Sequence, residues 1–553
     1  MSESPLVLVN DYLPEEYHLD LQISSIKPNF QGYLKFPLKR ARNDFDQFKL
    51  VLHGHKLIIL EALVGGVKLD VKYDKPAQKI ELSTSQPISQ FDVTIKYVGS
   101  IQSLDTIQQT RGVFRSPGDK VIISTQSQPI FARQILPLID ESNFKIPFKL
   151  TITTEKHFKV IANMGLEAES VNGDEKTSVF KKSPPILPST IGFTIGELEG
   201  KIIQSSIPIG VYGTKEDMES VNIPYIMSIL EKVFPLIQSK LGAYPLDKLD
   251  IIGVPYLTEG AMENWGMITV VKDHLFKGHE LHIKQLLSHE LIHQWLGNLV
   301  SFDNWKYLWL NESMATLLGN YFVSVLDGND EAFKLDLMTI NERLCNDDHH
   351  SIEKFMNSLV INNDITTSYL FNHQVYEKGI IILRMLVNVI SDKVDDFDKF
   401  FEFLKDFVEF YKFKSIKPQD LWTFIYKDLS VDLLTFVNIW IRYDKFPTLQ
   451  ITINDNQLTI EQMQSKVYHF PLILKTSNGS KKVYIMNKVT KVEISDLLVI
   501  NQDKITLFKG DISKKIIKTI DISQLNKLDT NVYLIDYKAG DFNKKLQQHV
   551  NNL

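Results

Sequence analysis

The segment 286-LLSHELIHQWLGNLVSFDNWKYLWLNES-313 decides how this chain is organised. It contains the pentapeptide HELIH, with His289 and His293 four positions apart and Glu290 beside the first histidine. Residues four apart lie about one turn apart on the same face of a helix, so both imidazoles can reach one zinc ion at about 2.0–2.1 Å. Glu290 is then placed to take a proton from a water bound to that ion.

A catalytic zinc takes three protein ligands and keeps one position open, so the two histidines need a companion. Glu312 follows His293 after eighteen intervening residues, in the sequence Leu-Asn-Glu-Ser, and is the natural candidate. We expect it on a second helix that begins near Asn311. The pentapeptide alone also fits a buried helix with two incidental histidines, so the metal site depends on further motifs.

Two such motifs flank the pentapeptide in the chain. GAMENWG occupies residues 260–266, and VYEKG occupies residues 375–379. Together with the pentapeptide and Glu312, they resemble the M1-type zinc aminopeptidases of the aminopeptidase N and puromycin-sensitive kind, which are relatives of leukotriene hydrolase. The resemblance covers nearly the whole chain, from about Tyr17 to Tyr537. It implies one Zn²⁺ per chain, held by His289, His293 and Glu312.

The resemblance also implies the remaining roles in the site. Glu290 would be the general base, and Tyr376 would donate a hydrogen bond to the oxyanion. Glu263 would bind the cationic amino terminus of the peptide, and Gln128 would accept a hydrogen bond from the same amine. Gln126 would line the first side-chain pocket, although a polar strand edge explains the two glutamines equally well. The substrate-binding residues expected from the GAMEN motif are Gly260, Ala261, Met262, Glu263 and Asn264.

Three positions depart from the family pattern. Ser313 replaces the usual glycine after the third ligand, and Gly319 stands where the family commonly has an acid. Losing a carboxylate that supports a metal ligand typically costs roughly 10- to 100-fold in affinity or activity. Glu259 replaces a small or apolar residue and adds negative charge beside the GAMEN motif. That charge could favour basic substrates or perturb the base by coupling between like charges.

The hydrophobic pattern predicts an α+β multidomain protein. Residues 1–212 alternate apolar and polar positions, as in Phe148-Lys-Leu-Thr-Ile-Thr-Thr, which indicates an N-terminal all-β saddle or sandwich domain. Residues 213–443 change to helical spacing, for example over 222–241, and the resemblance implies a thermolysin-like α/β catalytic domain there. Residues 444–537 return to short strands and predict a small β-sandwich. Residues 538–553 would begin a helical domain that the family carries and that we expect to be truncated or absent.

The composition is ordinary for a soluble protein, with 44% hydrophobic and 23% charged residues. A net charge of −6 and a sequence pI near 6.2 give no reason to expect nucleic-acid binding. One cysteine, no apparent secretory signal and no run of eighteen apolar residues favour a cytoplasmic protein that does not enter a membrane. We expect peptides with a free amino terminus as its partners.

Three functions compete on these grounds. The first is a zinc-dependent aminopeptidase that removes residues from peptide amino termini, with a metal-activated water and a glutamate base. The second is a catalytically weak or inactive relative that binds the amino termini of peptides or nascent chains. The third is an epoxide-opening hydrolase like leukotriene hydrolase, against which Ala261 argues because that branch usually has a second glycine there. The spare histidines are interpreted as surface or packing residues: His279, His282, His349 and His350.

Overall fold

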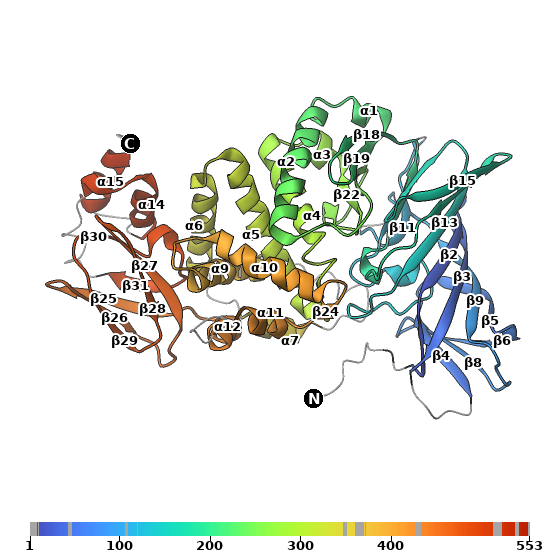
Figure 1. Cartoon of the computed structure of the whole chain (residues 1–553), viewed down its shortest axis with the longest axis horizontal. Coiled ribbons are helices and arrows are strands. Elements are labelled where there is room, and N and C mark those ends of the chain that lie inside the picture. The colour runs from blue at the N-terminus through green and yellow to red at the C-terminus, as the bar shows by residue number, and fades with distance from the viewer. Residues whose placement is uncertain are drawn as a thin grey trace. The chain divides into compact units, whose positions relative to one another are not determined.

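The computed structural model describes residues 8, 10–41, 47–105, 109–118, 120–346, 351–359, 370, 372–426, 433–512, 522–536 and 541–550. Their contacts divide them into two compact units (Figure 1). The first unit holds the described residues up to Trp305 together with Phe410–Ile416. The second holds the remaining described residues from Lys306 onward.

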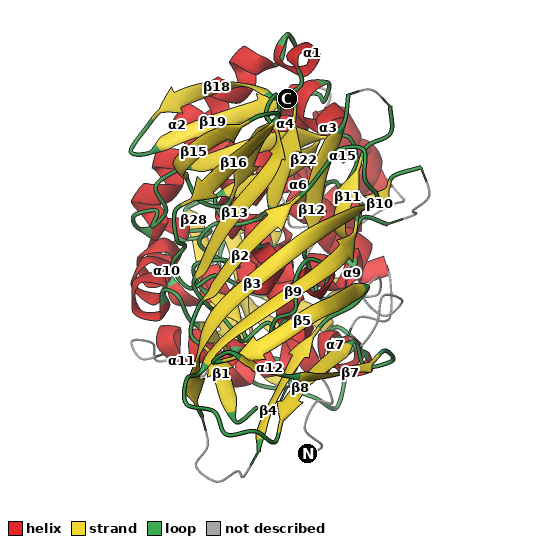
Figure 2. Ribbon diagram, turned by 90° about the vertical axis from the view of Figure 1, so that its right-hand side faces the viewer, coloured by secondary structure: helices red, strands yellow, loops and turns green. Residues whose placement is uncertain are grey.

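A large sheet dominates the N-terminal part of the first unit, and Figure 2 shows most of its strands side by side. Every second residue of β13 is buried and the residues between them are half-buried, as the sequence predicts. The side chains of one face therefore form a core while the other face meets solvent. In spatial order the described strands are β15 (Leu166–Asn172), β16 (Glu175–Phe180), β13 (Phe148–Glu155), β2 (Tyr17–Gln22), β3 (Asn29–Arg40), β9 (Asp92–Ser100), β5 (Leu57–Val64) and β6 (Val67–Lys68), with β1 (Tyr12–Pro14) beside β3.

Two smaller sheets complete the N-terminal region. The first of them delivers Gln126, at the end of β12, toward the candidate site described below. Its strands in order are β10 (Gln102–Ser103), β11 (Gly112–Arg115), β12 (Ile122–Gln126), β17 (Phe193–Gly196) and β14 (Lys159–Ala162). The second comprises β4 (Phe48–His53), β8 (Lys79–Thr84) and β7 (Asp70–Asp74).

The α/β part of the first unit carries the two motifs that matter most, GAMEN and the metal helix (green in Figure 1). Its sheet runs in the order β18 (Glu199–Gln204), β19 (Pro208–Gly213), β20 (Leu249–Val254), β22 (Met267–Val271) and β21 (Ala261–Met262). The short edge strand β21 is antiparallel to β22, whereas β19, β20 and β22 are parallel to one another. The helices are α1 (Lys215–Met218), α2 (Ile223–Leu241), α3 (Lys272–Phe276) and α4 (Glu280–His293).

The predicted helix over 222–241 is confirmed as α2, whose buried positions follow helical spacing. The chain leaves α4 at His293 through tight turns, and β23 (Ser301–Phe302) then pairs with β24 (Ser415–Ile416) inside the same unit.

The second unit is helical first and β-rich afterwards. The helices include α5 (Leu308–Asp327), α6 (Glu331–Asn346), α7 (Ile352–Ser358), α9 (His373–Ile390), α10 (Phe397–Tyr411, whose last two residues belong to the first unit), α11 (Pro418–Tyr426) and α12 (Leu433–Arg442). One C-terminal sheet comprises β29 (Val489–Glu493), β26 (Gln457–Gln462), β25 (Thr448–Asn454) and β31 (Lys509–Ile512), and the other β28 (Gly479–Ile485), β27 (Phe470–Thr476) and β30 (Leu497–Ile500). Helices α14 (Lys527–Asp536) and α15 (Asp541–Val550) follow.

The prediction of an α+β multidomain protein is confirmed: a β-rich N-terminal region, a mixed α/β region and C-terminal sheets follow one another. The domain boundaries at 212, 443 and 537 stay predictions. Among the described residues, every helix is too short or too polar to span a bilayer.

Candidate active site

Helix α4 places the two histidines as their spacing predicts. His289 is half-buried, and His293 is almost fully buried one turn later. Their Nε2 atoms lie 3.0 Å apart, and the ring planes are inclined at 78°. Two nitrogen ligands of a tetrahedral zinc ion lie about 3.3 Å apart when each bond is about 2.0–2.1 Å. The spacing of the two nitrogens therefore suits a shared metal ion.

The backbone after α4 fixes how His293 presents its ring. Its Nδ1 lies 3.2 Å from the carbonyl oxygen of Leu296. A carbonyl can only accept, so Nδ1 must carry the proton and Nε2 keeps its lone pair for a metal. A hydrogen bond of this kind orients metal-binding histidines and raises their basicity.

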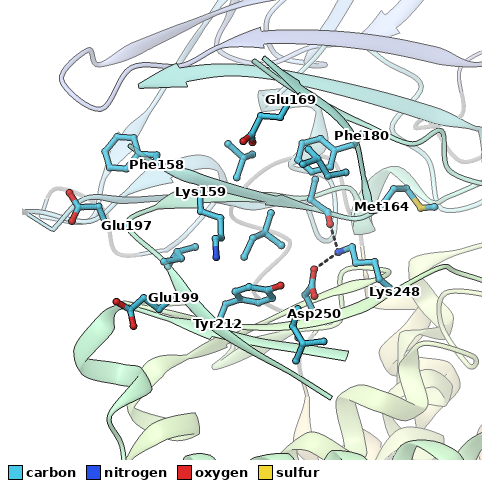
Figure 3. Close-up of a pocket in the computed structure, with 18 of the residues that line it drawn as sticks. Phe158, Lys159, Met164, Glu169, Phe180, Glu197, Glu199, Tyr212, Lys248 and Asp250 are labelled. Carbon is cyan, nitrogen blue, oxygen red and sulfur yellow. Dashed lines mark hydrogen bonds and ion pairs between the residues drawn. The ribbon is translucent and has the colours of Figure 1, made fainter. Parts of the chain in front are cut away.

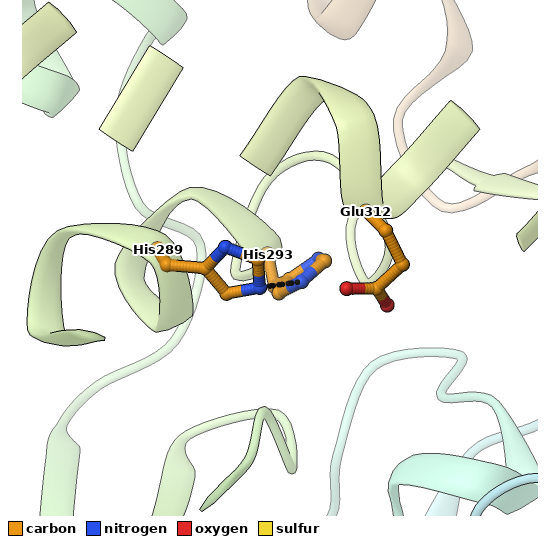
Figure 4. A group of neighbouring side chains, drawn as sticks. All are labelled: His289, His293 and Glu312. Atoms are coloured by element: carbon orange, nitrogen blue, oxygen red, sulfur yellow. Dashed lines mark hydrogen bonds between the residues drawn. The ribbon is translucent and has the colours of Figure 1, made fainter. Parts of the chain in front are cut away.

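Glu312 joins the two histidines, as Figure 4 shows for its carboxylate and the two imidazoles. Among the described residues these three form a group whose ligand atoms all lie within 4.8 Å of one another. Two imidazoles and one carboxylate are a donor set used by catalytic zinc sites, so these residues fit the metal that the sequence implied. Glu312 lies on α5, which begins at Leu308, three positions before the predicted start near Asn311, because a 3-10 turn over Trp305–Tyr307 leads into it.

Glu290 is buried on α4 directly after His289, and 7% of its surface is exposed. A carboxylate kept from bulk water next to a metal-binding imidazole can exchange a proton with a water in the site. Its role as the base remains a prediction from the motif.

The proposed amine anchor lies in the first unit with its predicted helper. Glu263 follows the edge strand β21, and its Oε1 accepts a hydrogen bond of 2.9 Å from Nε2 of Gln128. Because the amide nitrogen of Gln128 is used in this bond, its Oε1 is the atom that can accept from a substrate amine. Gln126 lies beside them and donates from Nε2 to the sulfur of Met262 at 3.4 Å.

Two of the expected substrate-binding residues have a buried amide oxygen that lacks a protein partner. Within the described part of the chain, Oε1 of Gln126 and Oδ1 of Asn264 have no hydrogen-bond partner. Leaving a buried acceptor unsatisfied costs about 1–3 kcal/mol, so such atoms are candidates to bind a ligand. Gly260 and Ala261 begin the GAMEN motif, and the φ of Gly260 is +84°, which favours glycine.

The residues of the second unit have contacts of their own. Tyr376 lies on α9, and its hydroxyl donates to the carbonyl oxygen of Leu370 at 2.9 Å. Ser313 is fully buried on α5, and its Oγ donates to the carbonyl oxygen of Tyr376 at 2.8 Å. Burial lowers the pKa of Lys378 to about 7, and its Nζ donates to the carbonyl oxygen of Tyr443. The serine that departs from the family pattern therefore links the helix of the third ligand to that of the tyrosine.

The two other departures from the family pattern differ in burial, and the described spare histidines are exposed. Glu259 is exposed, so water screens its charge, while Gly319 is buried within α5. His279 and His282 are exposed, in accord with their interpretation as surface residues. His349 and His350 lie outside the described residues.

A cavity of about 890 Å³ lies elsewhere in the first unit, between β14 and the face of β18, β19 and β20 (Figure 3). The ammonium of Lys248 at its floor donates to Asp250 at 2.6 Å and to the carbonyl oxygens of Ala162 and Gly266 at 2.5 and 2.9 Å. All three protons of the ammonium are thereby used. Lys248 thus links β14 to β20 and to Gly266, the last residue of GAMENWG.

Sequence reasoning missed two residues that hold the anchor. Gln294 and Asn298 follow the metal pentapeptide, and both donate from their side-chain amides to the carbonyl oxygen of Glu263, at 3.1 and 2.7 Å. An amide just past the end of a helix resembles an ordinary polar turn residue. The signal that could have found them is their almost complete exclusion from solvent, which no single sequence displays.

Two protein-family models together match most of the length of this chain. Residues 13–189 match the model described as the peptidase M1 N-terminal domain, and residues 225–440 match the peptidase family M1 domain. The second match contains His289, His293, Glu312, Glu263 and Tyr376.

Curated relatives agree with these matches. The chain is 30% identical to Protein TMA108 of Saccharomyces cerevisiae, over 91% of this chain and 60% of that protein. It is 28% identical to Probable aminopeptidase 2 of Sulfurisphaera tokodaii, over 80% of this chain and 59% of the relative. It is 25% identical to Alanine/arginine aminopeptidase of Saccharomyces cerevisiae, over 91% and 61% respectively. The chain thus spans about 60% of the length of these relatives.

Proposed function

This chain belongs to peptidase family M1, and on that premise we propose that it is a zinc-dependent aminopeptidase that removes single residues from the amino termini of peptides. The family is one of zinc aminopeptidases with a His-Glu-x-x-His and distant Glu site. Several relatives are named as aminopeptidases, which supports the proposal for this chain.

The observation that carries the proposal is the grouping of His289, His293 and Glu312. These residues would hold zinc, which when bound lowers the pKa of a coordinated water toward about 7 and polarises the carbonyl to be attacked. Two histidines on one helix without a third ligand would support a catalytic zinc site less strongly.

The chain's own groups would then divide the work. Glu263, with Gln128 beside it, binds the ammonium of the first substrate residue and so fixes which peptide bond lies at the reactive position. Glu290 takes the proton from the attacking water and passes it to the leaving amine. The hydroxyl of Tyr376 donates to the oxyanion, a contribution that typically amounts to about 100- to 1000-fold in rate.

Unsatisfied acceptors support the same assignment of the substrate cleft. The buried amide oxygens of Gln126 and Asn264 flank the anchor, and a bound peptide carries backbone N–H donors that could satisfy them. Residues 260–264 would line this cleft, with β21 offering its edge to an extended peptide.

A second function is a protein that binds free amino termini and cleaves slowly or never. One observation favours it: the hydroxyl proton of Tyr376 is donated to the carbonyl of Leu370, and an oxyanion would need that same proton. Under this alternative, nascent chains are among the candidate partners.

One experiment separates the two functions. The purified chain is incubated with zinc and a panel of aminoacyl-coumarin substrates, beside Glu290→Gln and a control, Glu280→Gln, which alters an exposed acid on the same helix. The aminopeptidase is supported if the wild type and the control cleave and Glu290→Gln does not. Intact peptides bound through a free amino terminus, with no cleavage by any variant, would support the binding protein instead.

A further inference from the structure

The segment that carries the anchor has no regular structure of its own. Strand β21 ends at Met262 and β22 begins at Met267, so residues 263–266 lie outside both strands. They are nevertheless buried: Glu263 is 9% exposed and Trp265 1%. Backbone N–H groups serve part of the segment: Asp250 in β20 donates to the carbonyl oxygen of Gly266 at 3.1 Å, and Met267 donates to that of Asn264 at 2.9 Å. The remaining buried backbone groups must find their hydrogen bonds elsewhere.

Side chains from the end of the metal helix supply them on one side. Nε2 of Gln294 and Nδ2 of Asn298 both donate to the carbonyl oxygen of Glu263, at 3.1 and 2.7 Å. The Oε1 of Gln294 also accepts from the backbone N–H of Gly266 at 3.0 Å. Gln294 therefore binds both ends of this short segment.

Two further side chains hold the other side. Asn163 donates to the carbonyl oxygen of Trp265 at 2.8 Å, and Lys248 donates to that of Gly266 at 2.9 Å. Gly266 has a φ of +77°, and a Cβ there would lie 2.3 Å from the carbonyl oxygen of Asn163. The segment thus rests in a close-fitting set of polar partners, which we call the cradle: Asn163, Lys248, Gln294 and Asn298.

We propose that Gln294 and Asn298 are positioning residues that fix Glu263 relative to the metal-binding histidines; this rests on the proposed function. Gln294 directly follows His293, and the backbone N–H of Asn298 donates to the carbonyl oxygen of His293 at 3.0 Å. The metal ligand and the donors that grip the anchor therefore belong to one short, hydrogen-bonded piece of chain. The distance from the amine site to the reactive bond is set by this piece.

A fixed distance has a measurable consequence. Misplacing a bound substrate by about 1 Å can cost roughly 100-fold in rate, because reacting atoms must lie within a near-attack distance. Loosening the cradle should weaken recognition of the amine while leaving the metal in place. The expected loss is selective for ligands that carry a free amine.

The test uses two metal-binding probes, leucine hydroxamate and its des-amino analogue, on the zinc-loaded full chain. Calorimetry measures both affinities for the wild type, Gln294→Met and Asn298→Ala, with zinc content determined for each. We expect the preference for the amine-bearing probe to fall roughly 10- to 100-fold in both variants. The affinity for the des-amino probe should stay unchanged.

The matched control is Gln462→Met in the second unit. Gln462 is also a fully buried amide that holds a turn, through Tyr468. It should leave the preference for the amine at its wild-type value. An undiminished preference in both cradle variants, or equal losses for the two probes, overturns the positioning role.

A second readout keeps this proposal separable from the proposed function. Amide hydrogen exchange across residues 260–267 should quicken in Gln294→Met, because Gly266 loses its acceptor. Unchanged exchange overturns the cradle whatever the activity. If the wild type binds both probes equally tightly, the proposed function fails, and the positioning role fails with it. Faster amide hydrogen exchange in Gln294→Met would still show that the cradle holds the backbone of this segment.

Discussion

The segment of the amine anchor and the contact between α5 and α9 are stabilised in different ways. Four side chains from several elements bond the backbone of residues 263–266. Between α5 and α9, the hydroxyl of Ser313 donates to the carbonyl oxygen of Tyr376. Next to it, the missing side chain of Gly379 provides the space for close approach.

This difference predicts how each region responds to substitution. Where several bonds hold one segment, removing one leaves the others in place, and the losses should be graded. Where one hydroxyl and one glycine define a close contact, two residues depend on each other and their effects should not add. The four predictions below begin with the largest effect, and the last of them tests this contrast.

The largest effect is expected at the tyrosine of α9. Tyr376→Phe should lower kcat by about 100- to 1000-fold with little change in KM, because the oxyanion loses a donor that acts only in the transition state. Steady-state kinetics with an aminoacyl-coumarin substrate measures it. Tyr33→Phe, at an exposed tyrosine of β3, is the control. A kcat within twofold of the wild type would remove Tyr376 from the mechanism.

The next effect concerns the anchor itself. Glu263→Ala should raise KM and lower kcat together, with a loss in kcat/KM of roughly 10- to 100-fold, because the same group binds the amine and orients the bond. Gln128→Met removes the partner of Glu263 and an uncharged acceptor for the amine, and it should cost less because the carboxylate of Glu263 remains. An unchanged kcat/KM in Glu263→Ala would refute the anchoring role.

The sequence correctly predicted the features that depend on a regular hydrophobic period or on a short interval between two residues. Strict alternation identified β13, and helical spacing over 222–241 identified α2 within one residue. The interval between His289 and His293 predicted a pair of facing nitrogens, and the distance of 3.0 Å confirms it. Each of these features follows from local geometry, which neighbouring residues determine.

Contacts between distant segments could not be predicted in that way. Gln294 and Asn298 lie 31 and 35 positions from Glu263, and nothing in their own surroundings specifies that pairing. Ser313 looked like a defect because its sequence position suggests only that a larger residue has replaced glycine. Its hydroxyl is in fact bonded to Tyr376 on α9, a helix some sixty residues later in the chain.

A pH-dependent effect should appear beside the cradle. Nζ of Lys145 donates to the carbonyl oxygens of Asn298 and Leu299, and burial lowers the pKa of Lys145 to about 7. An unfolded lysine has a pKa of about 10.4, so between these values the unfolded chain binds more protons than the folded one. The contribution of Lys145 to stability should therefore rise with pH by up to about 1.4 kcal/mol per unit and be constant below pH 7.

Denaturant unfolding of the wild type and Lys145→Met across pH 6 to 10 measures this contribution as a difference. Lys201→Met, at an exposed lysine of β18, is the control. A flat difference for Lys145→Met would mean that its ammonium titrates as it does in water.

The smallest expected effect tests the contact between α5 and α9. A Cβ at Gly379 would lie 2.1 Å from Oγ of Ser313 and 2.8 Å from the ring of Trp309. Gly379→Ala gains about 1 kcal/mol of helix propensity but overpacks a buried contact at about 1–3 kcal/mol, so a net destabilisation of up to about 2 kcal/mol is expected. In the Ser313→Gly background the nearest clash is gone, but the ring of Trp309 still crowds the site. The remaining overpacking should then offset the gain in helix propensity, so the same substitution should be close to neutral. A double-mutant cycle of unfolding free energies measures the coupling. Additive effects would show that the two helices do not depend on this pair, and the contrast with the cradle would then disappear.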